Sequence, residues 1–357
     1  MSDLLSRARA MRPVLSERAP ATEQGGRVVP DSVTAMIGAG FTRMLQPRAY
    51  GGGWRTVEEF IDVCAALAQG CMSTGWCNFV WGVHNYLIAL YPEAVRDRVW
   101  ADPTALTAAS LGPAGTVTYT EDGNADISGH WRFASGCDHA DWLLLGCKPS
   151  AGGEPQLALV EKSNHVVEGS WDVTGLVGTG SKDVRIDVAH VSADRLLPFS
   201  QCLVPYGGLL VLVVVAPLLG AAERAIELFT EQLHSRKLAA SGKLQGDTGT
   251  AKLRLAEASA EVGAAQAIVR ESAAVIDAQP RRDAKDTAKV LRDTAFAAKL
   301  CRAAVDRIFE ASGGAALHLD GELQRIWRDV HAGSAHARLD WDAAADTYAN
   351  EVLKTES

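Results

Sequence analysis

Two histidines near the C-terminal end of the sequence, His331 and His336, have side chains that can bind a metal, transfer protons or simply pack. They lie in the stretch IWRDVHAGSAHARLD. On one continuous helix their five-residue spacing turns the two side chains about 140° apart. Zinc-binding pairs on a helix are instead four residues apart, so that both face one ion. The spacing therefore disfavours a metal and leaves catalysis and packing open for each histidine.

A second group of candidate residues lies on a predicted strand, GHWRFASG. Trp131 and Phe133 share one face of that strand, and Ser135 continues it at the two-residue period. A flat aromatic wall that ends in a hydroxyl suits a planar heteroaromatic ring such as a flavin, although the core strand of a β-domain is an equal alternative. The glycine-rich connection GLVGTGSKDV (175–184) offers exposed amides and Ser181 to a cofactor, or forms an ordinary turn.

The composition is that of a soluble globular protein. Of the 357 residues, 47% are hydrophobic and 22% charged, and the length suggests two or three domains. The net charge of −8 is spread along the chain, without the basic patch that binds nucleic acid. Seven cysteines without a C-x-x-C pair, and an N-terminus without a continuous apolar stretch, predict reduced thiols, no signal peptide and a cytoplasmic location.

Several common sequence motifs are absent. There is no H-E-x-x-H motif, no G-x-x-x-x-G-K-[ST] loop and no complete dinucleotide fingerprint, so we expect neither a metal site nor a nicotinamide site. The longest apolar run, LLVLVVVAPLL (209–219), is too short to span a membrane and contains a proline. We expect it to form a buried helix.

Hydrophobic periodicity divides the chain into three parts that must position these residues. Residues 1–103 look helical, with a capping box at Thr56 and Glu59 before an apolar helical pattern. Residues 104–205 alternate as short strands, which indicates a small β-barrel or sandwich. Residues 206–357 form long alanine-rich helices typical of an antiparallel bundle. The predicted class is α+β, mainly α.

Three motifs in this order resemble a known family. They are W-x-F-x-S-G, the run WDVTGLVGTGSKDVRIDVAHVSADR and the terminal WRDVHAGSAHA. Together they resemble the acyl-CoA dehydrogenase superfamily, and more closely its two-component flavin-dependent monooxygenase branch, which includes the oxygenase components of hydroxyphenylacetate and steroid-phenol hydroxylases. The resemblance implies an N-terminal helical domain, a central β-barrel and a C-terminal four-helix bundle. It also implies a homotetramer with the flavin at the junction of the domains and a neighbouring subunit.

The resemblance also implies a reaction. A separate flavin reductase supplies reduced flavin (FMNH2 or FADH2), which reacts with O2 to a C4a-hydroperoxide, and this species hydroxylates an aromatic or polycyclic small molecule. A dehydrogenase of the superfamily needs a carboxylate base in its C-terminal bundle, whereas here no Glu lies between Glu322 and Glu351 and the matching region offers His336. Three alternatives stay open: a dehydrogenase-like flavoenzyme, a monooxygenase that oxidises nitrogen or sulfur, and a non-catalytic scaffold.

The resemblance assigns roles to individual residues. His336 becomes the catalytic acid or base, with Asp340 expected to orient its ring and His331 expected to pack. Ser135 matches the residue that bonds the flavin N5. On the substrate side the matching residues are Trp76, His84 and Ser110.

The remaining expected contacts are to the cofactor. Phe133, Gly180 and Ser181 are expected to touch the flavin itself. Arg236, or Lys237 as an alternative, matches an arginine on its phosphate or pyrimidine side. The turn EASGGA (310–315) resembles a cofactor-phosphate turn that is supplied across a subunit interface.

Overall fold

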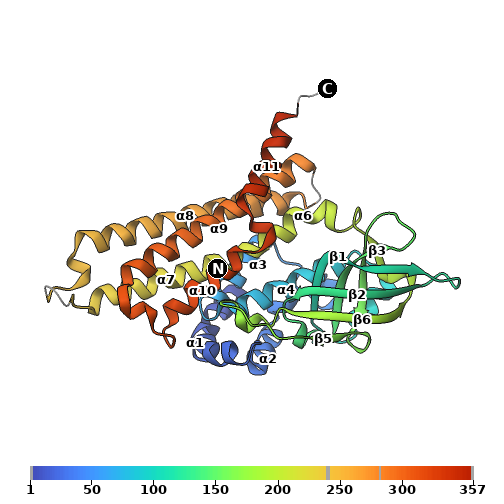
Figure 1. Ribbon diagram of the computed structural model, residues 1–357, viewed down its shortest axis with the longest axis horizontal. Coiled ribbons are helices and arrows are strands. Elements are labelled where there is room, and N and C mark those ends of the chain that lie inside the picture. The colour runs from blue at the N-terminus through green and yellow to red at the C-terminus, as the bar shows by residue number, and fades with distance from the viewer. Residues whose placement is uncertain (1–2, 239–241, 281–282, 355–357) are drawn as a thin grey trace.

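The computed structural model describes residues 3–238, 242–280 and 283–354 (Figure 1). Five helices form the N-terminal part. Of the predicted capping box the Thr56 half is present, since Thr56 Oγ1 accepts a hydrogen bond from the Glu59 N–H at 3.1 Å, whereas the Glu59 carboxylate lies 3.9 Å from the Arg55 guanidinium. These helices are α1 (Asp3–Gln24), α2 (Pro30–Ala39), α3 (Val57–Ala68), α4 (Met72–Ile88) and α5 (Glu93–Val99). Nearly all of α4 is buried, so this helix forms the centre of the N-terminal part.

The central part is one seven-stranded sheet in the order β5-β6-β2-β1-β3-β4-β7. Its strands are β1 (Thr107–Tyr119), β2 (Ala125–Ala134), β3 (Trp142–Pro149), β4 (Gln156–Glu161), β5 (Val166–Glu168), β6 (Lys182–Val191) and β7 (Leu196–Pro198). Register shifts in the β1–β3 and β2–β6 ladders bend these long strands. Along β3 the buried residues alternate: Leu143 and Leu145 face a core inside the β-domain, whereas Leu144 packs with α4 and α5. Among the described strands, β5 and β7 remain edges, so the predicted barrel is not closed by hydrogen bonds.

The C-terminal part is a helical bundle built from α7, α8, α9 and α10, with α6 leading into it and α11 projecting from it (Figure 1). The helices are α6 (Leu203–Leu212), α7 (Ala216–Ser235), α8 (Gly249–Ala278), α9 (Ala284–Ser312), α10 (Glu322–Ser334) and α11 (Trp341–Leu353). Small residues such as Ala265 and Ala297 are buried between the helices and permit close packing. The order helices, sheet, bundle is as predicted, although the expected boundary at 205–206 falls inside α6.

The apolar run near residue 210 belongs to a buried helical segment, as expected. The stretch Leu203–Ser235 is long and apolar enough to cross a membrane by composition, but 72% of its most apolar window is buried inside the protein. It supplies the core between α3, α4 and the bundle. Burial by neighbouring helices therefore accounts for its hydrophobicity.

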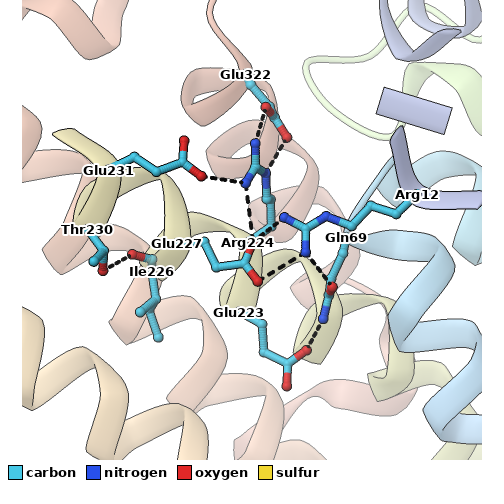
Figure 2. Close-up of polar contacts among 9 residues, drawn as sticks. All are labelled: Arg12, Gln69, Glu223, Arg224, Ile226, Glu227, Thr230, Glu231 and Glu322. Atoms are coloured by element: carbon cyan, nitrogen blue, oxygen red, sulfur yellow. Dashed lines mark hydrogen bonds and ion pairs between the residues drawn. The ribbon is translucent and has the colours of Figure 1, made fainter. Parts of the chain in front are cut away.

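A polar network ties the N-terminal helices to the bundle (Figure 2). Arg12 of α1 donates to Gln69, just after α3, and to Glu227 of α7, each at 3.0 Å. One turn before Glu227, Arg224 forms a bidentate pair with Glu322, the first residue of α10, at 2.8 and 3.0 Å. Since α10 leads to the candidate histidines, this network fixes the start of the helix that positions them.

Candidate active site

Three side chains of α4 hold the beginning of β1 and the end of β2. Trp76 Nε1 donates to Ser135 Oγ at 3.2 Å, and Trp81 Nε1 donates to the Gly136 carbonyl at 3.3 Å. Two turns beyond Trp76, His84 Nδ1 lies 2.8 Å from the Thr107 carbonyl. The helix therefore brings the expected residues Trp76, His84 and Ser135 to one junction between the helical part and the sheet.

The aromatic wall predicted on β2 is wrong in one respect. Trp131 is fully buried in the core of the β-domain, where its Nε1 donates to the Gly146 carbonyl at 2.7 Å, whereas Phe133 is 58% exposed. The register shifts between Trp131 and Ala134, and Phe133 adopts a left-handed φ of 62°. This bulge breaks the two-residue alternation, so the two rings point to different sides and only Phe133 is available to a ligand. Its ring contacts Trp171 edge-on at 5.8 Å between centroids.

The glycine-rich connection contributes to the site through hydroxyl groups rather than through exposed amides. Gly180 is buried, and its N–H donates to the Val177 carbonyl at 3.3 Å, so that amide is not free for a cofactor. Ser181 is also buried, but its Oγ lies 2.6 Å from Ser135 Oγ. The expected contact of Gly180 with a flavin is therefore not supported, and Ser181 reaches the site only through Ser135.

His336 lies beyond the helix that carries His331. Helix α10 ends at Ser334, and His336 is the N-cap of a short 3-10 turn (Ala337–Leu339), where its Nδ1 accepts from the Arg338 N–H at 3.2 Å. The angle expected for one continuous helix is therefore wrong, because the helix ends between the two histidines. The His336 ring packs edge-on against the Trp76 ring, with 5.9 Å between centroids. Trp76 thus touches both Ser135 and His336.

The two site histidines have lowered pKa values and opposite tautomers. Burial lowers the pKa of His84 to about 4, and burial together with the Arg338 cation lowers the pKa of His336 to about 4, so both rings are neutral near pH 7. A carbonyl can only accept, so His84 carries its proton on Nδ1 and Nε2 is an acceptor. A backbone N–H can only donate, so His336 carries its proton on Nε2 and donates there.

Asp340 does not take the orienting role expected for it. Its Oδ1 accepts from the Ala343 N–H at 2.9 Å and caps α11. His336 is instead oriented by the backbone of Arg338 and by the Trp76 ring. The expected turn between His336 and Asp340 is a 3-10 turn that leads directly into the next helix, which uses the carboxylate as its cap.

His331 occupies a packing position, as expected. Its Nε2 lies 2.7 Å from Asp306 Oδ1, and its ring lies against Trp327 with 4.5 Å between centroids. Trp327 Nε1 donates to the same carboxylate oxygen at 2.7 Å. Asp306 of α9 therefore joins two side chains of α10 within the bundle.

Ser110, the third substrate-side candidate, lies on β1. Its hydroxyl donates to the Arg132 carbonyl at 2.9 Å, directly before the bulge at Phe133. Ser110 is partly exposed, and it lies three residues beyond Thr107, the partner of His84. The strand therefore places Ser110 between the His84 end of the site and the exposed ring of Phe133.

Arg236 is separated from these residues within one chain. It follows α7, whose end lies at the side of the molecule opposite the sheet (Figure 1). There Arg236 Nη1 donates to the Ser312 carbonyl, beside the left-handed Gly313 of the EASGGA turn. The structure thus joins Arg236 to the turn at 310–315, at the end of α7 that lies away from the sheet.

Three further residues support the site and were not anticipated from the sequence. Thr179 Oγ1 lies 2.7 Å from Ser181 Oγ, Leu176 has a left-handed φ of 54°, and the buried carboxyl of Asp329 accepts from the Leu176 N–H at 2.6 Å. Burial raises the pKa of Asp329 to about 7. Thr179 lies in the GTGS run and could have been noticed there, but Asp329 looks like an ordinary surface residue of an amphipathic helix.

The arrangement can bind a planar ring beside a phenol-like ligand. Phe133 offers an exposed aromatic face, Ser135 offers a half-buried hydroxyl oxygen, His336 offers a donor and His84 an acceptor. These are the kinds of group that the polar edge of a flavin and a hydroxylated substrate require, since ligand sites combine apolar walls with a few polar atoms. Among the described residues no cluster of His, Cys, Asp or Glu could hold a metal ion.

Known proteins share this architecture. Residues 212–341 match the family model of the acyl-CoA dehydrogenase C-terminal domain. The chain is 32% identical to the oxygenase subunit HsaA of a flavin-dependent monooxygenase from Rhodococcus jostii (strain RHA1), with 96% of each chain covered. It is 29% identical to the oxygenase component of an FADH(2)-dependent resorcinol hydroxylase from a Rhizobium species, covering 99% of this chain and 94% of that one.

A solved structure agrees with these sequence similarities. The crystal structure of 3-HSA hydroxylase from Rhodococcus sp. RHA1 matches with a TM-score of 0.91 and 29% identity, covering 100% of this chain and 98% of that chain. The predicted fold and family are therefore confirmed. The chain belongs to the oxygenase subunits of two-component flavin-dependent monooxygenases, a branch of the acyl-CoA dehydrogenase superfamily.

Proposed function

We propose that this oxygenase binds reduced flavin, FMNH2 or FADH2, from a separate reductase and uses O2 to hydroxylate a small aromatic molecule at the junction of α4, β2 and the end of α10. One observation carries the proposal: Trp76 contacts both Ser135 and His336, the two residues expected beside the flavin. When bound, reduced flavin supplies the electrons that activate O2. The relative from Rhizobium is named for both FADH2 and a phenol, resorcinol, which supports this cofactor and substrate class.

The residues of the chain then have distinct tasks. Phe133 covers one face of the bound ring, and Ser135 accepts a hydrogen bond at N5. His336 would donate a hydrogen bond from Nε2 to the oxygen that is to be transferred. This hydrogen bond would hold the oxygen in the site until the substrate reacts. His84 accepts the substrate hydroxyl at Nε2, with Ser110 and Trp76 beside it. A neutral acceptor suits a phenol, because it can take a share of the proton as oxygen is added to the ring.

Cofactor binding provides a direct test. Anaerobic titration is expected to show tight binding of reduced flavin and weak binding of oxidised flavin, and the purified protein should be nearly colourless. A protein that retains stoichiometric oxidised FAD and does not bind reduced flavin would instead be a dehydrogenase-like flavoenzyme, and the proposal would fail.

We also infer a homotetramer in the cytoplasm, built through the C-terminal bundle. Arg236 and the turn at 310–315 lie together at the end of α7, on the side of the molecule opposite the sheet, so they complete a flavin site beside the sheet only if a neighbouring subunit supplies them. The seven cysteines are all buried and unpaired, which suits a reducing compartment. Light scattering is expected to report four copies. Replacement of Arg236 by Ala should weaken flavin binding without changing the Ser135 side of the site, whereas a monomer with intact binding would contradict both points.

A further inference from the structure

A chain of four polar groups ends at Ser135. Leu176 O, Thr179 Oγ1, Ser181 Oγ and Ser135 Oγ lie in sequence with separations of 2.7, 2.7 and 2.6 Å. Trp76 Nε1 donates to Ser135 Oγ from the other side at 3.2 Å. Thr179 and Ser181 are buried, whereas Ser135 is partly exposed, so only the last group of the chain can meet a ligand.

Hydrogen-bond chemistry fixes the direction of this chain. Each pair of oxygens is close enough to require one proton between them. The Leu176 carbonyl can only accept, so Thr179 donates its one hydroxyl hydrogen to it. Ser181 must then donate to Thr179, and Ser135 must donate to Ser181. Ser135 therefore donates its hydroxyl hydrogen to Ser181 and accepts a hydrogen bond from Trp76. Its second lone pair remains, so Ser135 can only accept a further hydrogen bond from a ligand.

The carbonyl that sets this direction is itself held in place. Leu176 has a left-handed backbone with φ 54°, and its N–H donates to the buried Asp329 at 2.6 Å. Trp171 Nε1 donates to the same Leu176 carbonyl at 2.9 Å. The first acceptor of the chain is thus fixed by contacts from α10 and from the segment after β5, and it cannot turn away without breaking them.

We propose that Thr179 and Ser181 are positioning residues that lock Ser135 as a hydrogen-bond acceptor and so make the site select reduced over oxidised flavin. The proposal rests on the proposed function, which places the flavin N5 at Ser135. N5 of reduced flavin carries a hydrogen and can donate to the Ser135 lone pair. N5 of oxidised flavin has no hydrogen, so two lone pairs face each other there. The hydroxyl chain therefore gives the site its preference without any charged group.

Replacement of Thr179 by Val tests this directly. Val removes the oxygen that accepts from Ser181, so Ser181 can instead donate to Ser135. The Ser135 hydroxyl hydrogen is then free to be donated to N5 of oxidised flavin. We expect the ratio of the dissociation constants for oxidised and reduced flavin to fall about fivefold, the effect of one ordinary hydrogen bond, mainly through tighter binding of oxidised flavin. Thr179→Ser keeps the hydroxyl and should retain the wild-type ratio. The readout is anaerobic titration by tryptophan fluorescence, with FMN and FAD in both redox states.

The matched control is Thr294→Val. Thr294 is fully buried in α9, and its Oγ1 donates to the Val290 carbonyl at 2.7 Å, so this variant loses the same kind of hydroxyl away from the site. Its ratio should equal that of the wild type. Should Thr179→Val fail to fold, Ser181→Ala breaks the next link and should shift the ratio in the same direction.

The outcomes separate the hydroxyl chain from the proposed function. Suppose that the wild-type protein prefers reduced flavin and that folded Thr179→Val and Ser181→Ala keep its ratio of dissociation constants. This result would overturn the positioning role of Thr179 and Ser181 and leave the proposed function standing. An equal shift in Thr294→Val also overturns that role, because the effect would then follow from loss of any buried hydroxyl. A wild-type protein that binds no reduced flavin overturns the proposed function and the chain together.

Discussion

His84 and His336 are both neutral, both partly or fully buried, and both part of the candidate site, yet they present opposite groups to it. His84 donates a hydrogen bond from Nδ1 to the Thr107 carbonyl, so its Nε2 is an acceptor. His336 accepts a hydrogen bond from the Arg338 N–H at Nδ1, so its Nε2 is a donor. Their chemistry differs because a strand supplies a carbonyl to one and a 3-10 turn supplies an N–H to the other. Identical side chains thus acquire different roles from the backbone groups beside them.

Of the two histidines, loss of the hydrogen-bond donor at His336 should have the larger effect on product yield, and the largest among the variants considered. In His336→Ala, reduced flavin should still be consumed by O2, but hydrogen peroxide should replace most of the hydroxylated product. Loss of a positioned proton donor typically lowers the productive rate by about 10²–10⁴-fold. Product formed per reduced flavin, measured with a supplied reductase and a surrogate phenol, checks this. Unchanged product yield would remove His336 from the site.

Loss of the Ser135 hydroxyl, which bonds Trp76, should have a smaller effect. Ser135→Ala removes one hydrogen bond of ordinary strength, about 1 kcal/mol, so peroxide release should become several-fold faster while the fold stays intact. Stopped-flow measurement of peroxide release with and without substrate checks the expectation. An unchanged rate in a folded variant would show that Ser135 does not contact the flavin.

The acceptor role of His84 can be tested in a variant that keeps the hydrogen bond to the Thr107 carbonyl. In His84→Asn the side-chain amide can still donate to the Thr107 carbonyl, but no acceptor remains where Nε2 was. We expect KM for a phenol to rise about fivefold, with little change in melting temperature. In His84→Gln the amide reaches farther and can restore an acceptor in the Nε2 region. Equal KM values for the two variants would argue against His84 as the substrate acceptor.

The lowered pKa values predict a flat pH profile. A group with an ordinary histidine pKa, about 6.5, would titrate between pH 8 and 6. Because burial lowers the pKa of both histidines to about 4, they stay neutral across that range and become protonated only as the pH falls further. Asp329, whose pKa burial raises to about 7, does titrate in this range, so the measurement is made in Asp329→Asn, where product yield per reduced flavin should be constant from about pH 8 to 6. In that variant, a loss of yield centred near the ordinary histidine pKa would show that His84 or His336 is protonated near neutral pH, which would contradict the assignment of two neutral rings.

The smallest effect on catalysis is expected for His331→Ala. This change removes the hydrogen bond to Asp306 and the contact with Trp327, so it should lower the free energy of unfolding by about 1 kcal/mol and leave product yield unchanged. Thermal unfolding and product yield, measured together, distinguish it from His336→Ala. If His331→Ala uncouples the reaction and His336→Ala does not, the two roles are reversed.

The sequence by itself determined the order of the three parts, the helical cap at Thr56, the buried apolar helix and the family. These features depend on local periodicity, capping chemistry and motifs, which neighbouring residues in the chain express directly. It also identified His84, Ser135 and His336 as candidates through their motifs. The sequence could not place Arg236, because its partner, the Ser312 carbonyl, lies 76 residues away in the chain.

Only the tertiary structure decided how those candidates present their polar atoms. The bulge at Phe133 separates it from Trp131 although strand periodicity pairs them, and the end of α10 separates His336 from His331 although one helix was expected. The tautomers of His84 and His336 and the direction of the hydroxyl chain depend on carbonyl and N–H groups from other elements. Hydrogen bonds act over a few ångströms in space, so partners far apart in the chain leave no local pattern to read.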